Sequence, residues 1–105
     1  MEAPNLSYIN SLSGNDEAFK TRLIDIIKIE LPKEIQNYVN NIAAGNFKEA
    51  AANVHKLKHK ISILGLEESY KVAESYEDSL LEQSRAEQVE FENILKIMTS
   101  FITTI

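Results

Sequence analysis

Apolar residues recur every three or four positions along most of this 105-residue chain. Such spacing places them on one face of an α-helix, whereas a β-strand would require strict alternation. Only three glycines and two prolines interrupt the pattern, so the chain has few places to turn. The longest apolar face is predicted to comprise Phe19, Leu23, Ile26, Ile27, Leu31, Ile35, Tyr38, Val39 and Ile42.

Five helices are expected, over residues 5–12, 16–44, 47–64, 67–81 and 86–103. Asn15 or Asp16 can cap the second helix, because a short polar side chain accepts hydrogen bonds from the free N–H groups of a first turn. Pro32 falls inside this helix and removes one backbone hydrogen bond. We expect a kink there, with a true break at Glu30–Leu31 as the alternative.

Four long amphipathic helices joined by short loops predict an all-α fold, an antiparallel up-down-up-down four-helix bundle. The short first helix is expected to pack over one end. The length suits one hydrophobic core, and no linker or repeat divides residues 1–105, so a single domain is predicted. Met1 stands almost directly before the first helix, which suggests a complete small protein; a domain excised from a larger kinase is the alternative.

Charge and composition exclude several classes of function. The net charge of −5 argues against a nucleic-acid binder or an anionic-membrane binder. With no cysteine, the chain can form neither disulfides nor a thiolate zinc site. No signal peptide and no apolar run of membrane-spanning length is present. We therefore expect a cytoplasmic protein, and a monomer by default.

The segment around His55 is locally basic although the chain as a whole is acidic, because three lysines stand within residues 56–60. At about 100° per residue, His55, His59 and Ser62 lie to one side of the apolar stripe, and Lys58 lies near its border. An imidazole is a nucleophile near neutral pH, and lysines supply the positive charge that a dianionic phosphoryl group requires. A histidine in this setting can carry a phosphoryl group, although the spacing alone also fits an ordinary surface histidine.

The stretch from Val54 to Leu66 resembles the histidine-containing phosphotransfer (HPt) domain of two-component phosphorelays. The resemblance extends over nearly the whole chain, from Leu6 to about Phe101. One departure stands out, since the family usually has glycine where this chain has His59. The positions that match the family signature are His55, Leu57, Lys58, Leu64 and Gly65.

The resemblance implies that His55 accepts a phosphoryl group from the aspartyl phosphate of one receiver domain and passes it to the aspartate of another. The implied partners are response-regulator receiver domains and a hybrid histidine kinase. The chain would then be a carrier rather than an autonomous enzyme. It would need no cofactor, because the magnesium site belongs to the receiver. The chain also lacks a glycine-rich loop for ATP.

Two further residues are candidates for the chemical site. Lys58, one turn after His55, is expected to pair with phosphoryl oxygens. Glu77 is expected on the antiparallel neighbouring helix at a similar height, where its carboxylate could fix the tautomer and ring angle of the histidine. The family often has Gln or Glu at this spacing. Glu74 and Asp78 are weaker candidates.

We expect Leu6, Ile9, His59 and Ser62 to form the receiver docking surface around His55. Two other functions remain open. The chain could be a helical adaptor that binds receiver-like partners without phosphotransfer. His55 and His59, at i and i+4, could also clamp a metal ion, although the lysines between them would repel a cation.

Some polar side chains are expected to lie in solvent without a role in the site. Lys56 and Lys60 are interpreted as a solvated helix face that contributes only screened attraction. Tyr38, Tyr70 and Tyr76 are expected at core edges with their hydroxyl groups in water.

Overall fold

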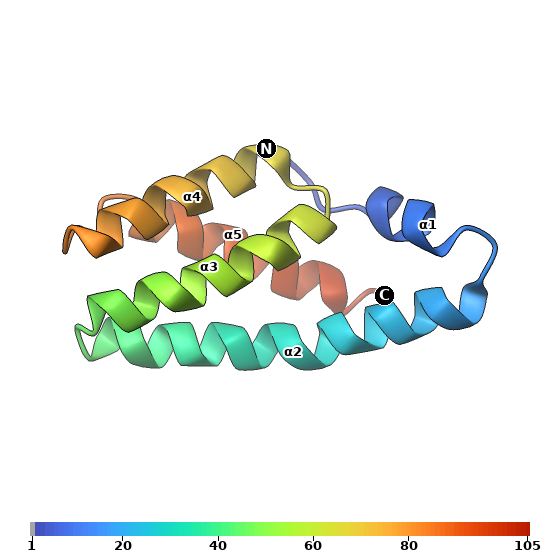
Figure 1. Cartoon of the computed structure of the whole chain (residues 1–105), viewed down its shortest axis with the longest axis horizontal. Coiled ribbons are helices and arrows are strands. Elements are labelled where there is room, and N and C mark those ends of the chain that lie inside the picture. Colours follow the sequence, from blue (N-terminus) through green and yellow to red (C-terminus); the bar gives the residue numbers. More distant parts are fainter. Residues whose placement is uncertain (1) are drawn as a thin grey trace.

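The computed structural model describes residues 2–105, and within them it contains five α-helices and no strand. Helices α2 to α5 form the antiparallel four-helix bundle, and α1 lies over one end of it (Figure 1). The predicted all-α fold is confirmed. The single-domain prediction also includes Met1, which lies outside the described residues. The helices are α1 Ser7–Ser13, α2 Glu17–Ala43, α3 Phe47–Ile63, α4 Glu67–Leu81 and α5 Gln88–Ile102.

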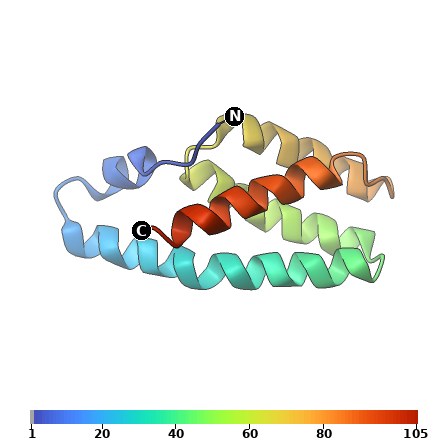
Figure 2. The same ribbon diagram turned by 180° about the vertical axis from the view of Figure 1, so that it is seen from behind.

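The long helix α2 extends past the ends of its neighbours, so that α1 folds back over its first turns (Figure 2). Asp16 caps it, because its carboxylate accepts a hydrogen bond from the backbone N–H of Phe19 at 2.9 Å. Pro32 lies inside the helix without dividing it, so the alternative of a break at Glu30–Leu31 is wrong, and the kink stays a prediction. Among residues 2–105, no helix combines the length and the apolar character needed to cross a membrane.

The core runs along the axis of the bundle and receives side chains from all five helices. Helix α3 contributes an unbroken buried stripe, in which Val54, Leu57 and Ile61 are fully excluded from solvent. Burying each such side chain stabilises the fold by roughly 1.5–3 kcal/mol. The same stripe fixes the rotation of α3, so His55 is turned outward.

An ion-pair cluster fastens α3 to α2. Nζ of Lys60 lies 3.0 Å from Oε1 of Glu30 and 3.2 Å from Oε2 of Glu34. The prediction that Lys60 is solvated is wrong, because its aliphatic chain lies along α2 and only 12% of the side chain is exposed. Burial alone would lower the pKa of Lys60, but the two carboxylates raise it above its ordinary value. Lys56 is exposed, as expected.

Tyr38 and Tyr76 were expected to keep their hydroxyl groups in water, and this prediction is wrong. Both are fully buried, and their hydroxyl oxygens lie 2.7 Å apart. The Tyr38 hydroxyl also donates to Oε2 of Glu92 at 2.8 Å. Helices α2, α4 and α5 converge at this point, so each hydroxyl finds a partner inside the bundle. Tyr70 is half-buried.

Several large apolar residues are exposed, among them three of the apolar face predicted for α2. Leu81 and Val89, on α4 and α5, have 58% and 75% of their surface exposed. Leu81 is turned about 100° from the buried Leu80 on its helix. Val89 lies off the stripe that begins at Phe91. Flanking positions of α2 are also more than a third exposed, at Phe19, Ile26 and Val39.

The segment before α1 is tied across the turn between α3 and α4. The backbone N–H of Asn5 donates to the carbonyl of Leu64 at 2.9 Å. The carboxylate of Glu2 accepts hydrogen bonds from the backbone N–H groups of Glu68 and Ser69 at the start of α4. Although burial opposes this, those N–H groups lower the pKa of Glu2 below its ordinary value. This segment therefore holds α1 beside the C-terminal end of α3.

Candidate functional site

His55 projects from the outer side of α3 toward α4, and 55% of its side chain is exposed. Its neighbours Val54 and Leu57 are buried, so the backbone beneath the imidazole is rigidly held while the ring is accessible. This is the arrangement expected of a nucleophile that another protein must reach.

Glu77 meets His55 from α4. Its Oε2 atom lies 3.1 Å from Nδ1 of His55, although the two residues are 22 positions apart in the chain. Of the three acidic candidates on this helix, Glu77 is the one that the fold brings to the imidazole. The contact favours the tautomer in which Nδ1–H donates to the carboxylate. Nε2 then keeps its lone pair on the opposite side of the ring.

Lys58 completes a three-group cluster. Its Nζ lies 3.0 Å from Oε1 of Glu77, so one carboxylate joins the ammonium and the imidazole. The residue is 8% exposed, deeper than the border position expected for it, and its Nζ lies 5.5 Å from the centre of the Tyr70 ring. Burial alone would lower the pKa of Lys58, but the hydrogen bond and charge of Glu77 raise it.

The cluster balances charge in a way that suits anion transfer. The ammonium of Lys58 compensates the negative charge of Glu77, and the imidazole of His55 contributes a hydrogen bond to the same carboxylate. A positive charge that develops on the imidazole would be stabilised by the carboxylate already in place. Lys56, which is exposed on the same helix, adds a screened positive charge near a phosphoryl group arriving at His55. The predicted direct pairing of Lys58 with phosphoryl oxygens stays a prediction.

His59 lies one turn beyond His55 and is exposed. The two rings meet edge to face, with centroids 5.3 Å apart and an angle of 88° between their planes. Within residues 2–105, no group of three or more His, Asp or Glu side chains is arranged to hold a metal ion. The proposed metal clamp would therefore have only the two histidines as protein ligands, whereas zinc sites usually have three or four.

The predicted docking residues divide into two groups. Ser62 is exposed, whereas Leu6 is half-buried and packs against the core. Ile9 is fully buried, so the prediction that it forms part of the docking surface is wrong. Helix α1 turns Ile9 onto the core and turns Tyr8 outward, with half of its surface exposed. A helix of seven residues is too short for its apolar spacing to fix that rotation.

The Hpt domain family model matches residues 22–101, which include the three residues of the cluster and most of the bundle. No curated protein and no solved structure matches the chain.

Proposed function

The chain belongs to the Hpt domain family, and from this premise we propose that His55 accepts a phosphoryl group from the aspartyl phosphate of one receiver domain and passes it to the aspartate of another. Hpt domains are phosphocarriers of two-component phosphorelays rather than enzymes. The partners that we propose are response-regulator receiver domains and a hybrid histidine kinase. The carrier acts as a cytoplasmic monomer.

The observation that carries this proposal is the shared carboxylate of Glu77. It contacts Nδ1 of His55 at 3.1 Å and Nζ of Lys58 at 3.0 Å. A surface histidine without such a partner would exchange between tautomers and ring orientations. Here the second nitrogen, Nε2, is left as the nucleophile at a fixed position.

The transfer step follows from this geometry. The lone pair of Nε2 forms a bond to phosphorus while the bond from phosphorus to the aspartyl oxygen breaks, and the aspartate leaves as a carboxylate with that electron pair. The imidazole ring gains positive charge, which Glu77 stabilises through the proton on Nδ1. The reverse step delivers the phosphoryl group to the next receiver. Magnesium belongs to the receiver in this scheme, and the chain itself uses no cofactor.

The proposal is tested with receiver domains phosphorylated by radioactive phosphate. Incubation with the protein should yield acid-labile, base-stable label on the chain. The variant His55→Gln should take up none while its helical circular dichroism stays unchanged, because His55 lies outside the core. His59→Gln is the matched control, since that histidine lies on the same exposed face one turn away.

Label on His55→Gln would overturn the site assignment. If label is lost only in His59→Gln, the neighbouring histidine carries the phosphoryl group. Tight receiver binding without any label would support the adaptor function instead.

A further inference from the structure

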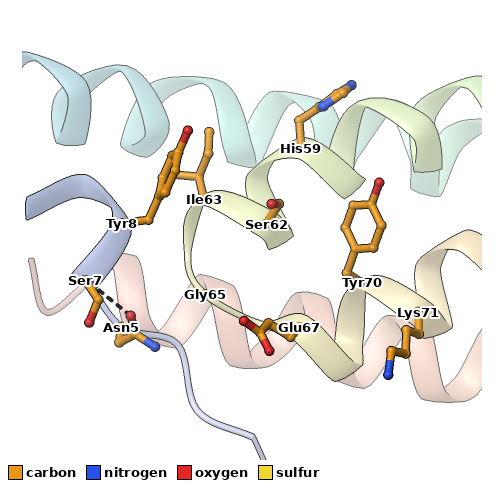
Figure 3. A pocket seen from close by; sticks show the side chains of 10 residues that line it. All are labelled: Asn5, Ser7, Tyr8, His59, Ser62, Ile63, Gly65, Glu67, Tyr70 and Lys71. Carbon is orange, nitrogen blue, oxygen red and sulfur yellow. Dashed lines mark hydrogen bonds between the residues drawn. The ribbon is translucent and has the colours of Figure 1, made fainter. Parts of the chain in front are cut away.

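Two grooves of the bundle lie on different faces. The larger, of about 820 Å³, lies beside His59 between α1, α3 and α4 (Figure 3), on the face where receivers are expected to dock. The other, of about 540 Å³, lies between α2 and α5. Figure 2 shows α5 on the near side of the bundle with α2 beside it, whereas α3 lies behind. This second groove, which we call the α2–α5 groove, therefore faces away from His55.

The walls of the α2–α5 groove are apolar. Ile35 and Val39 line it from α2, and Leu95 lines it from α5. Leu95 is 5% exposed, and Tyr38, which also lines the groove, is fully buried, so the core holds both in place. Val39 is 43% exposed although it is apolar. A ligand that covers Val39 would remove apolar surface from water, which favours binding.

One carboxylate, that of Glu92, lines this apolar groove. Its Oε2 atom accepts hydrogen bonds from the Tyr38 hydroxyl at 2.8 Å and from Nε2 of Gln88 at 2.9 Å. Its Oε1 atom accepts none, and within residues 2–105 no cationic side chain forms an ion pair with Glu92. Oε1 is not enclosed by the protein, so a ligand can reach it. An ammonium group would supply the missing charged partner.

Lys96 stands one turn after Glu92 and lines the same groove from an exposed position. The i, i+4 spacing would allow the two side chains to pair, yet they form no ion pair. Exposed pairs of this kind are weak, so Lys96 competes little with a bound ammonium group for the carboxylate. Its own ammonium group is available to a ligand that also carries a carboxylate.

The volume of the α2–α5 groove lies within the range of about 300–1,000 Å³ that is usual for small-molecule sites, which are mostly apolar with a few polar groups that orient the ligand. We propose that this groove binds a small ligand with an ammonium group and an apolar or aromatic body. The ammonium group pairs with Oε1 of Glu92, and the body lies against Ile35 and Val39. A primary amine and an apolar amino acid share this chemistry. The inference does not depend on the proposed function, because the His55 face stays free.

Three probes with the same phenyl body test the requirement for an ammonium group. 2-Phenylethylamine carries it, 2-phenylethanol replaces it with a neutral hydroxyl, and phenylalanine adds a carboxylate. NMR shift changes of the Val39 and Leu95 methyl groups give each Kd. The amine should bind with a Kd of about 1 mM or lower. The alcohol should bind about tenfold more weakly, because it makes no charge-assisted hydrogen bond.

The variant Glu92→Gln removes the charge but keeps an acceptor for the Tyr38 hydroxyl. It should raise the Kd of the amine by about tenfold and leave that of the alcohol unchanged. Glu90→Gln is the matched control, since Glu90 is exposed on the same helix but does not line this groove. It should retain the parental Kd. Circular dichroism establishes that both variants are folded.

A second variant occupies the groove without altering its carboxylate. Val39→Phe adds bulk to the wall and should raise the Kd of the amine and of the alcohol alike, by about tenfold. Ile29→Phe is its control, because Ile29 is also an exposed apolar residue of α2 but lies outside the groove. This control should bind both probes as the parent does.

Phenylalanine and Lys96→Gln distinguish the two sources of the ammonium group. Weaker binding of phenylalanine alone by Lys96→Gln identifies an amino-acid site, whereas preference for the amine with no effect of Lys96→Gln identifies an amine site. The inference fails if the alcohol binds as tightly as the amine, or if Glu92→Gln and Val39→Phe both bind the amine as the parent does. Equal weakening by Glu90→Gln and Glu92→Gln would also contradict it, since the overall negative charge would then explain the binding.

Discussion

Nδ1 of His55 lies 3.1 Å from Oε2 of Glu77, a residue of the neighbouring helix. The other oxygen of that carboxylate lies 3.0 Å from Nζ of Lys58, so a single side chain links the imidazole to a buried ammonium group. The three groups come from two helices whose mutual register is set by the turn at Gly65. The orientation of the imidazole therefore depends on the packing of α3 against α4.

Glu77→Ala should slow phosphoryl acceptance from a receiver by about 10- to 100-fold, the loss expected for one charge-assisted hydrogen bond of about 1.5–3 kcal/mol. The rate of phosphoryl acceptance by Glu77→Gln should lie between those of Glu77→Ala and the parent, because the amide oxygen of glutamine still accepts a hydrogen bond from Nδ1–H of His55. Rapid-quench transfer assays give the rates, and nitrogen NMR shifts of His55 report the tautomer.

Glu74→Ala is the control for this prediction, since Glu74 is exposed one turn earlier on the same helix. If Glu77→Ala accepted phosphoryl groups as fast as the parent and the tautomer of His55 were unchanged, Glu77 would not orient the imidazole.

Lys58→Ala should affect both transfer and stability. We expect a 10- to 100-fold slower transfer, from the loss of about 1.5–3 kcal/mol of charge stabilisation. We also expect unfolding to become easier by about 1–3 kcal/mol, because Glu77 loses its ammonium partner in a partly buried site. Urea titration measures the second effect.

Lys56→Ala serves as the control, because it removes the same charge from an exposed position on α3. If Lys58→Ala and Lys56→Ala changed the transfer rate equally, the contribution of Lys58 would be only long-range charge.

Much of this site could be predicted from the sequence. The apolar spacing on α3 fixes which side of that helix faces the core, and thereby turns His55 outward. The short turn at Gly65 fixes the antiparallel register, so that Glu77 arrives beside His55. Both inferences concern one helix or one pair of helices joined by a tight turn. For such cases periodicity and loop length are sufficient.

The features that the sequence does not predict depend on how separate helices pack against one another. The pairing of Tyr38 with Tyr76 and Glu92 depends on how α2, α4 and α5 are rotated relative to one another. The residue spacing within a single helix carries no information about that rotation. Lys60 was assigned to solvent because a lysine on a helix flank has no visible partner until the neighbouring helix is placed. The buried position of Ile9 likewise depends on how the short helix α1 docks.

The buried tyrosine pair makes stability sensitive to alkaline pH. Burial, together with the hydrogen bonds to Tyr76 and Glu92, raises the pKa of Tyr38 above its ordinary value of 10.0. Because the folded protein favours the neutral phenol, this contribution is fully present below about pH 10 and is lost as the pH rises further. Tyr38→Phe should lose about 1–3 kcal/mol at neutral pH, since its hydrogen bonds vanish, and its stability should fall less steeply in alkali.

Urea unfolding from neutral pH to about pH 11 tests this prediction. Tyr8→Phe is the control, because that hydroxyl belongs to a half-exposed residue on α1. If the free energy of unfolding of Tyr38→Phe fell as steeply with rising pH as that of the parent, other groups would be responsible for the loss of stability in alkali. The candidates are Tyr76, Lys58 and Lys60, whose pKa values are also raised in the folded protein.

His59 is the residue at which this chain departs from the usual family pattern, and its position suggests control over partner choice. Its ring lies edge to face against His55, with centroids 5.3 Å apart, and it also lines a groove together with Tyr8 and Tyr70. It makes no contact with the shared carboxylate of Glu77, which is occupied by His55 and Lys58. His59 thus lies one turn from the proposed nucleophile, and a receiver that docks at His55 would have to accommodate it.

His59→Gly should therefore leave phosphorylation of His55 by phosphoramidate unchanged and broaden the set of receivers that exchange phosphate. Glycine inside a helix costs about 0.5–1 kcal/mol relative to alanine, so His59→Ala separates the effect of space from that of helix stability. A panel of receiver domains, assayed for transfer with the parent and both variants, gives the profile. A profile unchanged in both variants would make His59 an incidental surface residue. Loss of phosphoramidate labelling would instead place His59 inside the chemical site, because a small donor needs no docking surface and is sensitive only to the groups that act on the phosphoryl group itself.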